Sequence, residues 1–279
     1  MKHSNKHIII YVCSAILGLF LISLALAYFT MFRDPVTVIF KRLYPHAFLG
    51  SRLISLNDVE EAGIVAAKFG LSEDDGQAKY FEYEKKLALA RSMRLTAKAD
   101  TAADELRFYT KGNESEYANI LKNTYGNSER VFYKYLIYPQ VTDSMLRIKY
   151  YQDTKLTSPA YKEALTALEQ LKKGEKFEEL AKTLSDDKIS GALGGDLGFY
   201  ESGQVLPELE DQISISALGD YRKDVVITRL GYHLVYPVEY SNIDGKKLWH
   251  AKHILFAEDG YDAWLQNQVS ATKIVYLKK

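Results

Sequence analysis

The chain has 279 residues, which is enough for one large domain or two ordinary domains with hydrophobic cores. Its 36 lysines and arginines equal its 36 aspartates and glutamates, so no net charge favours nucleic acid or an acidic substrate as a partner. The hydrophobic fraction of 47% is typical of an ordered protein. The single cysteine, Cys13, excludes an intrachain disulfide and a cysteine metal cluster.

An uncharged, mostly apolar segment runs from Ile8 to Phe32. A helix of about 20 such residues crosses the hydrocarbon core of a bilayer, so we expect a single-pass anchor in the cell (inner) membrane. Lys2 and Lys6 precede the segment and favour a cytoplasmic N-terminus with the bulk of the chain outside the cytoplasm. The alternative is a cleaved signal peptide, because Ala25-Leu26-Ala27 has the small-x-small form of a cleavage site. Cleavage near Ala27 would give a secreted or periplasmic protein.

The sequence after the anchor predicts a stalk and then a helical segment. Val36 to Leu43 is apolar with basic spots and could lie at a membrane surface. From Leu53 onward the apolar residues have helical spacing, and Ser55 or Asn57 can cap the first helix. A longer helix is expected around residues 80–96.

Helices and then strands are predicted in the second half of the chain. Ser158-Pro159 predicts a helix start, with serine as the N-cap, and Gly174 can end that helix at positive φ. A second helix with an apolar face begins at Phe177. Two strands are expected, at residues 225–228 and 232–240, and Pro237 favours an irregular or edge position in the second.

Four sequence fragments in this region follow one another in a fixed order. They are 177–187 with its Ser185-Asp186-Asp187 ending, Gly194-Gly195-Asp196-Leu197-Gly198-Phe199, Gly203-Gln204-Val205-Leu206-Pro207, and Gly231-Tyr232-His233. Together they resemble the parvulin family of peptidyl-prolyl isomerases. The resemblance implies an α+β fold, with an antiparallel sheet and flanking helices similar to the FKBP-like fold. It also implies an isomerase that uses no metal and no cofactor.

One expected fragment of the parvulin pattern is displaced. Parvulins open with a strand reading approximately Ala-x-His-Ile-Leu, and no such strand precedes Phe177. The matching residues, Ala251 to Phe256, come after the other fragments instead. We therefore expect a circularly permuted domain, since the sequence from Ala251 onward is too short to form a second parvulin core.

The resemblance assigns roles to eight residues. It implies a catalytic set and a set that binds the substrate proline: Asp187, His233 and His253 for the first, and Leu197, Val205, Leu209, Thr228 and Tyr200 for the second. Three positions depart from the family pattern, because Val205 replaces methionine, Leu209 replaces phenylalanine and Leu230 replaces a hydroxyl residue. Without these roles, Leu197 would be an ordinary core leucine and Asp187 a solvated acid at a helix end.

The joint use of the two histidines depends on a hairpin register. His233 faces His253 only if the loop between the strands is centred on Ile243, with three or five residues. Asp244-Gly245 also predicts a two-residue turn, and that register would place His253 on the opposite face of the sheet. We expect the centred loop, because it restores the displaced strand to its usual partner.

The segment before the parvulin-like region resembles the helical chaperone module of SurA- and PrsA-type foldases, through Tyr125-Gly126-Asn127-Ser128 and scattered later positions. An unrelated helical spacer is the alternative. The expected division of the chain is an anchor at 1–33, a stalk at 34–52, a helical module at 53–153, a permuted parvulin-like domain at 154–260, and a closing helix and strand at 261–279.

The predicted function is a membrane-anchored isomerase and chaperone for extracytoplasmic proteins. Its partners would be unfolded clients with X-Pro bonds and the membrane, with no nucleic acid. Two alternatives remain open. One is a non-catalytic holdase that uses the parvulin-like domain to bind unfolded clients, and the other is an adaptor for a membrane complex.

Overall fold

The structure is a computed structural model, and it describes residues 44–50, 52–98, 100–243 and 245–277. The predicted membrane anchor, Ile8 to Phe32, lies outside these ranges. Within them, no helix combines the length and the apolar character that a membrane span requires. The described residues fall into two compact units, 44–80 with 272–277, and 81–271.

The first unit contains a small antiparallel sheet and a helix. Strand β1 (Pro45–Leu49) lies between β2 (Arg52–Ser55) and β7 (Ile274–Tyr276), and α3 (Leu56–Ala67) follows. Ser55 caps α3 as predicted, since its hydroxyl accepts the amide N–H of Asp58. Residues 45–49 of the expected stalk segment form this strand, which pairs with β7 from a distant part of the sequence, a partner that local sequence does not reveal.

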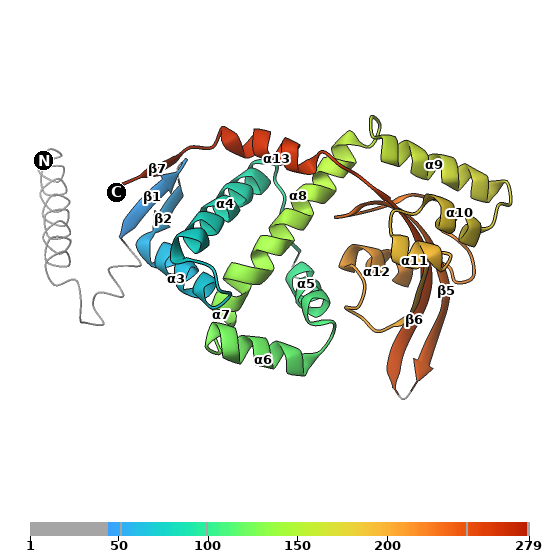
Figure 1. Cartoon of the computed structure of the whole chain (residues 1–279), viewed down its shortest axis with the longest axis horizontal. Coiled ribbons are helices and arrows are strands. Elements are labelled where there is room, and N and C mark those ends of the chain that lie inside the picture. The colour runs from blue at the N-terminus through green and yellow to red at the C-terminus, as the bar shows by residue number, and fades with distance from the viewer. Residues whose placement is uncertain (1–43, 51, 99, 244, 278–279) are drawn as a thin grey trace, which may run out of the picture. The chain divides into compact units, whose positions relative to one another are not determined.

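Helices form the first part of the second unit. Helix α4 (Glu73–Ser92) begins before this unit, seven residues earlier than the expected start at residue 80. It is followed by α5 (Thr101–Thr110), α6 (Glu114–Tyr125), α7 (Glu129–Phe132), a π-helical segment (Tyr133–Ile137) and α8 (Tyr138–Thr154). The π-helical segment lies just before Pro139. Because Pro139 has no amide N–H, one hydrogen bond of a regular helix is missing there, which favours such a local widening. The long α8 runs toward the sheet domain (Figure 1).

The second part of this unit is an α+β domain, as predicted. Its antiparallel sheet has the order β3-β6-β5-β4, with β3 (Asp196–Tyr200), β4 (Val226–Thr228), β5 (Gly231–Ile243) and β6 (Lys246–Ala257). The helices are α9 (Pro159–Lys172), α10 (Phe177–Leu184), α11 (Lys188–Ala192), α12 (Pro207–Ser214) and α13 (Tyr261–Ser270). Ser158 caps α9 and Gly174 follows that helix at φ 96°, both as predicted.

The two faces of the sheet contribute to different hydrophobic clusters. On one face, side chains of the two central strands pack against α8, α9, α10 and α13. These strand residues are Tyr232, Leu234, Ile254 and Phe256. On the other face Val235 and Ala251 pack with residues of β3, β4 and α12. Because side chains alternate along a strand, His233 and His253 lie on this second face, which we call the site face.

The β5–β6 hairpin does not use the predicted loop. Ile243 pairs with Lys246, which leaves residues 244 and 245 between them, so the loop centred on Ile243 is wrong. A β-bulge between Pro237 and Glu239 then shifts the register by one residue, which makes His233 pair with Leu255 and Val235 pair with His253. The irregularity predicted near Pro237 is therefore present, and it returns His253 to the face of His233.

Strand β6 has two partners, β5 and β3, so His253 lies in the interior of the sheet. A circularly permuted parvulin domain requires the strand of His253 to lie beside the strand of His233, as it does here. The permutation itself stays a prediction.

Candidate active site

The three predicted catalytic residues come from separate elements and meet on the site face. Asp187 is the N-cap of α11, where its carboxylate accepts the amide N–H groups of Ile189 and Ser190. His253 lies on β6 and His233 on β5. The short helix therefore holds the carboxylate rigidly at the end of the histidine pair.

A glycine brings β6 close enough to the α11 segment to form this site. The amide of His253 donates to the carbonyl of Gly195 at 2.9 Å. Gly195 has φ +84°, and a Cβ on it would lie 2.3 Å from the carbonyl oxygen of His253. No other residue could occupy this position without moving β6. The Gly194-Gly195 motif thus contributes backbone contact, while its neighbour Leu197 contributes a side chain.

A continuous chain of hydrogen bonds joins the polar residues of the site. Asp187 Oδ2 lies 2.9 Å from His253 Nε2, and the Nδ1 atoms of His253 and His233 are 3.1 Å apart. His233 Nε2 is 2.8 Å from the Thr228 hydroxyl, which also accepts the amide N–H of Leu230 at 3.1 Å. This series of hydrogen bonds therefore connects Asp187, the N-cap of α11, with the turn between β4 and β5.

One arrangement of protons satisfies every member of this chain. An ionised Asp187 can only accept, so His253 donates to it from Nε2 and accepts at Nδ1. His233 then donates from Nδ1 and accepts the Thr228 hydroxyl proton at Nε2. Both imidazoles are neutral in this arrangement, which we infer from the hydrogen-bond partners.

The electrostatics of the site favour the same protonation states. Burial lowers the pKa of His233 well below its usual range, and the neighbouring His253 acts in the same direction. Burial also lowers the pKa of His253, against the opposing effect of Asp187. Burial alone would raise the pKa of Asp187, but hydrogen bonds from Ser190 and His253 outweigh it and lower that pKa to about 2.

The members of the chain differ in their access to solvent. His233 has an exposed fraction of 0% and His253 of 6%, so both are buried. The side chain of Asp187 is 28% exposed and lies at the accessible end. His233 cannot contact a substrate in this conformation, and its contacts are those of a residue that orients His253.

The residues predicted to bind proline surround the apolar cluster of the site face. Leu197 and Val205 are partly buried at its edge, whereas Leu209, Tyr200 and Thr228 are buried. Leu230, where parvulins can have a hydroxyl, is 47% exposed. The structure thus brings all five predicted binding residues to the site face, with Leu197 and Val205 the most accessible.

The hydroxyl of Tyr200 is buried and has no hydrogen-bond partner among the residues that the structure describes. Burial raises the pKa of this phenol well above its ordinary value, and nearby Glu210 acts in the same direction. A neutral buried hydroxyl without a partner costs about 1–3 kcal/mol, so a ligand group that accepts its proton would recover that cost.

Sequence reasoning missed Ser190, which completes the polar end of the site. Its buried hydroxyl lies 2.7 Å from Asp187 Oδ2 and 2.9 Å from His253 Nε2. The signal was available, because a serine three residues after an N-cap aspartate lies within reach of that carboxylate. Arg229, which binds Glu105 and Glu208, was also missed.

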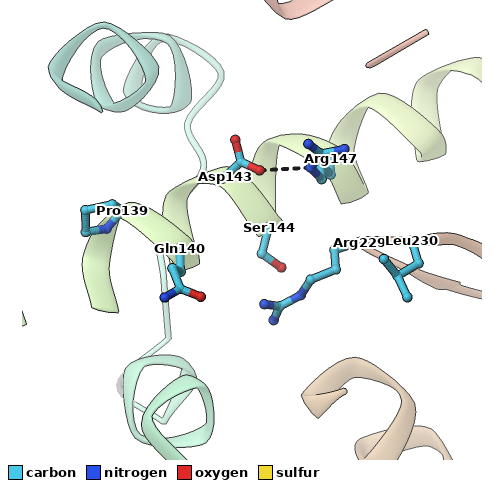
Figure 2. Close-up of a pocket in the computed structure, with 7 residues that line it drawn as sticks. All are labelled: Pro139, Gln140, Asp143, Ser144, Arg147, Arg229 and Leu230. Atoms are coloured by element: carbon cyan, nitrogen blue, oxygen red, sulfur yellow. Dashed lines mark hydrogen bonds and ion pairs between the residues drawn. The ribbon is translucent and has the colours of Figure 1, made fainter. Parts of the chain in front are cut away.

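A cavity of about 580 Å³ opens beside Leu230. Its lining comes from one side of α8 and from the β4–β5 turn: Pro139, Gln140, Asp143, Ser144, Arg147, Arg229 and Leu230. Figure 2 shows that the α8 residues extend along one wall, with Arg229 and Leu230 on the opposite side. The rim of the candidate site therefore borders on the helical part of the same unit.

The comparisons with known proteins assign a family to part of this chain. Residues 145–239 match the Rotamase family, described as "PPIC-type PPIASE domain", so the chain contains a parvulin-type peptidyl-prolyl isomerase domain. The match ends before β6, which carries His253.

Three curated relatives support the same class. The chain is 35% identical to "Foldase protein PrsA 1" of Bacillus cereus over 34% of each chain. It is 34% identical to "Chaperone SurA" of Nitrosospira multiformis, over 40% of this chain and 27% of the relative. It is 37% identical to "Periplasmic chaperone PpiD" of Haemophilus influenzae, over 26% and 12% respectively. The chain thus spans about a third or less of the length of these relatives.

Proposed function

We propose that this protein is a peptidyl-prolyl cis-trans isomerase and chaperone that assists the folding of extracytoplasmic proteins. The observation that carries the proposal is the hydrogen-bonded chain from Asp187 through His253 and His233 to Thr228, beside the apolar cluster of Leu197 and Val205. These residues belong to a polypeptide that matches the PPIC-type domain, and two of its relatives are named foldase and chaperone.

The reaction requires little chemistry from the protein. Rotation about an X-Pro bond breaks amide resonance, a barrier of about 18–20 kcal/mol, and transfers neither protons nor electrons. An apolar cradle at Leu197 and Val205 would hold the proline ring. Polar groups at its edge would stabilise the twisted amide more than the planar one, and such preferential stabilisation accelerates rotation.

The residues would divide this work according to their exposure. Asp187 is the accessible charged member and would act on the carbonyl through its field. His253 and the buried His233 would hold that carboxylate in position. The Tyr200 hydroxyl is buried and has no partner among the described residues, so it would donate to a client carbonyl only when client binding opens the cradle.

Clients and location belong to the same proposal. The helical segment before the sheet domain would bind unfolded chains that contain X-Pro bonds, as a chaperone module. The uncharged run from Ile8 to Phe32 would anchor the protein in the membrane, with its bulk outside the cytoplasm. A relative named as a periplasmic chaperone supports this location.

A holdase without isomerase activity is the second candidate. Leu230 stands where a hydroxyl is found in some parvulins, and Leu209 stands where phenylalanine is usual, so the cradle would be reduced. Refolding of a client whose slow phase is proline isomerisation separates the two candidates. The full chain should accelerate that phase, and Asp187→Asn should reduce the acceleration. Suppressed aggregation without acceleration would support the holdase instead.

A further inference from the structure

A buried ion-pair cluster connects the helical segment with the rim of the candidate site. Arg229 in the β4–β5 turn donates two hydrogen bonds to Glu105 on α5, at 2.9 and 2.7 Å. It donates a third to Glu208 on α12, at 2.9 Å. Ser144 on α8 donates to the same Glu208 oxygen at 2.6 Å. We call Arg229, Glu105, Glu208 and Ser144 the arginine clamp.

The clamp is buried, so its geometry is held firmly. The side chains of Glu105, Arg229 and Glu208 are 1%, 15% and 16% exposed. A guanidinium binds a carboxylate through two parallel hydrogen bonds in a fixed plane, which fixes orientation as well as distance. Water cannot replace these bonds easily at such low exposure.

The sequence neighbours of Arg229 are the two site residues of the β4–β5 turn. Thr228, directly before it, contacts His233, and Leu230, directly after it, lies on the rim of the site. The Leu230 amide N–H donates to the Thr228 hydroxyl, so the turn is one hydrogen-bonded unit. Figure 2 shows Arg229 and Ser144 approaching each other from the turn and from α8.

The clamp also reaches the other wall of the cradle. Glu208 immediately precedes Leu209 on α12, and α5 contacts the loop before that helix. A Cβ on Gly203 in that loop would lie 2.7 Å from the carbonyl oxygen of Arg107 on α5, so the two backbones are in close contact. Helix α5 therefore contacts both segments that border the proline cradle.

We propose that Arg229 is a positioning residue of the isomerase site. Its hydrogen bonds to Glu105 attach the β4–β5 turn to the helical segment and thereby hold Thr228 and Leu230 in place. This inference rests on the proposed function for its effect on turnover. The clamp makes the site depend on α5 and α8, which lie far from it in the sequence. Loosening the clamp lets the turn move and weakens the bond between Thr228 and His233.

The test is Glu105→Gln in the full chain, which keeps the shape of the side chain and removes its charge. We expect the Leu230 amide to exchange its hydrogen about tenfold faster and the imidazole nitrogen resonances of His233 to shift. We also expect kcat/KM for a proline peptide to fall by about tenfold, since a misplacement of about 1 Å can cost up to about 100-fold. Arg229→Lys keeps the charge but loses the two parallel hydrogen bonds of the guanidinium, so it should have a smaller effect in the same direction.

Lys86→Gln is the matched control. It breaks a 2.6 Å ion pair to Asp143 on α8 without contacting the turn, so exchange at Leu230 and the His233 signals should stay unchanged. If Glu105→Gln does not fold, Arg229→Lys alone decides the question. Unchanged Leu230 exchange and unchanged His233 signals in a folded clamp variant would overturn the inference. An inactive wild-type protein would overturn the proposed function instead, while exchange and resonances would still test the clamp.

Discussion

The Nδ1 atoms of His233 and His253 lie 3.1 Å apart because a β-bulge at Val238 separates the turn register of the hairpin from its core register. Next to the turn, Ile243 pairs with Lys246, and this register continued along β5 would place the two histidines on opposite faces. The single extra residue on β5 reverses that assignment. The shared hydrogen bond of the two histidines therefore requires that this extra residue be accommodated in a bulge, away from both histidines.

Deletion of Val238 should leave both the histidine pair and the outer part of the hairpin intact, because Pro237–Ala251 and Glu239–His250 would then follow each other in a regular ladder. The core register buries four large side chains on the face opposite the site, Tyr232, Leu234, Ile254 and Phe256, each with an exposed fraction of 1% or less. Each contributes about 1.5–3 kcal/mol, so the core register is kept. The contact of Tyr240 with Trp249, whose ring centroids are 4.9 Å apart, should be kept as well, because this pair continues the same ladder.

Tryptophan fluorescence would report the Tyr240–Trp249 contact, and nuclear Overhauser contacts between the imidazoles would report the histidine pair. Replacement of Val238 by alanine is the control, since it keeps the bulge. Loss of either contact in the deletion variant would contradict the assignment of the register shift to the single residue Val238.

The free energy of unfolding should decrease as the pH falls from about 7 to about 5. The folded pKa values of His233 and His253 are lowered, so the unfolded chain binds protons at these histidines where the folded chain does not. Stability is then greatest above the unfolded pKa of about 6.5 and is lost below it. His233→Gln should reduce the slope by at most about 1.4 kcal/mol per pH unit.

Urea unfolding at several pH values measures this slope. The difference in slope between wild type and His233→Gln isolates the contribution of this one histidine. An identical slope in wild type and His233→Gln would mean that His233 takes up its proton equally in both states.

Asp187→Asn should destabilise the protein by about 2 kcal/mol above pH 4. The folded pKa of Asp187 is lowered from 3.8 to about 2, so its contribution is fully present above the unfolded value and is lost as the pH falls toward 2. The difference from wild type should therefore shrink between pH 4 and pH 2. A destabilisation that is constant down to pH 2 would point to lost packing instead of lost charge.

Tyr200→Phe should separate stability from client binding. It removes a buried hydroxyl that has no partner among the described residues, so the free energy of unfolding should rise by about 1 kcal/mol. If that hydroxyl donates to a client carbonyl, KM for a proline peptide should rise in the same variant.

Tyr232→Phe is the matched control for this prediction. The Tyr232 hydroxyl donates to the carbonyl of Tyr151 at 2.9 Å, so its removal should lower the free energy of unfolding by about 1 kcal/mol. Chemical unfolding and steady-state kinetics on both variants make the comparison. A less stable Tyr200→Phe protein with unchanged KM would assign the hydroxyl a structural role.

Much of the fold follows from short-range signals that the sequence carries. The cap at Ser158, the positive φ at Gly174 and the helix at residues 261–270 were all predictable from neighbouring residues. Capping and chain conformation involve contacts within three or four positions. The candidate residues of the site were also identifiable, because the parvulin-like fragments follow one another along the sequence in the order that the family has.

Their arrangement was not predictable in the same way. Whether His233 and His253 share a face depends on a bulge that offsets the preferred turn, and this is a balance between the hairpin loop and a buried core. Strand β1 forms where a stalk was expected, because β7 supplies its hydrogen bonds from the other end of the chain. Arg229 joins Glu105 across 124 positions of sequence. Local propensity determines helices, caps and candidate residues, whereas register, strand pairing and buried ion pairs are decided by partners that become neighbours only when the chain folds.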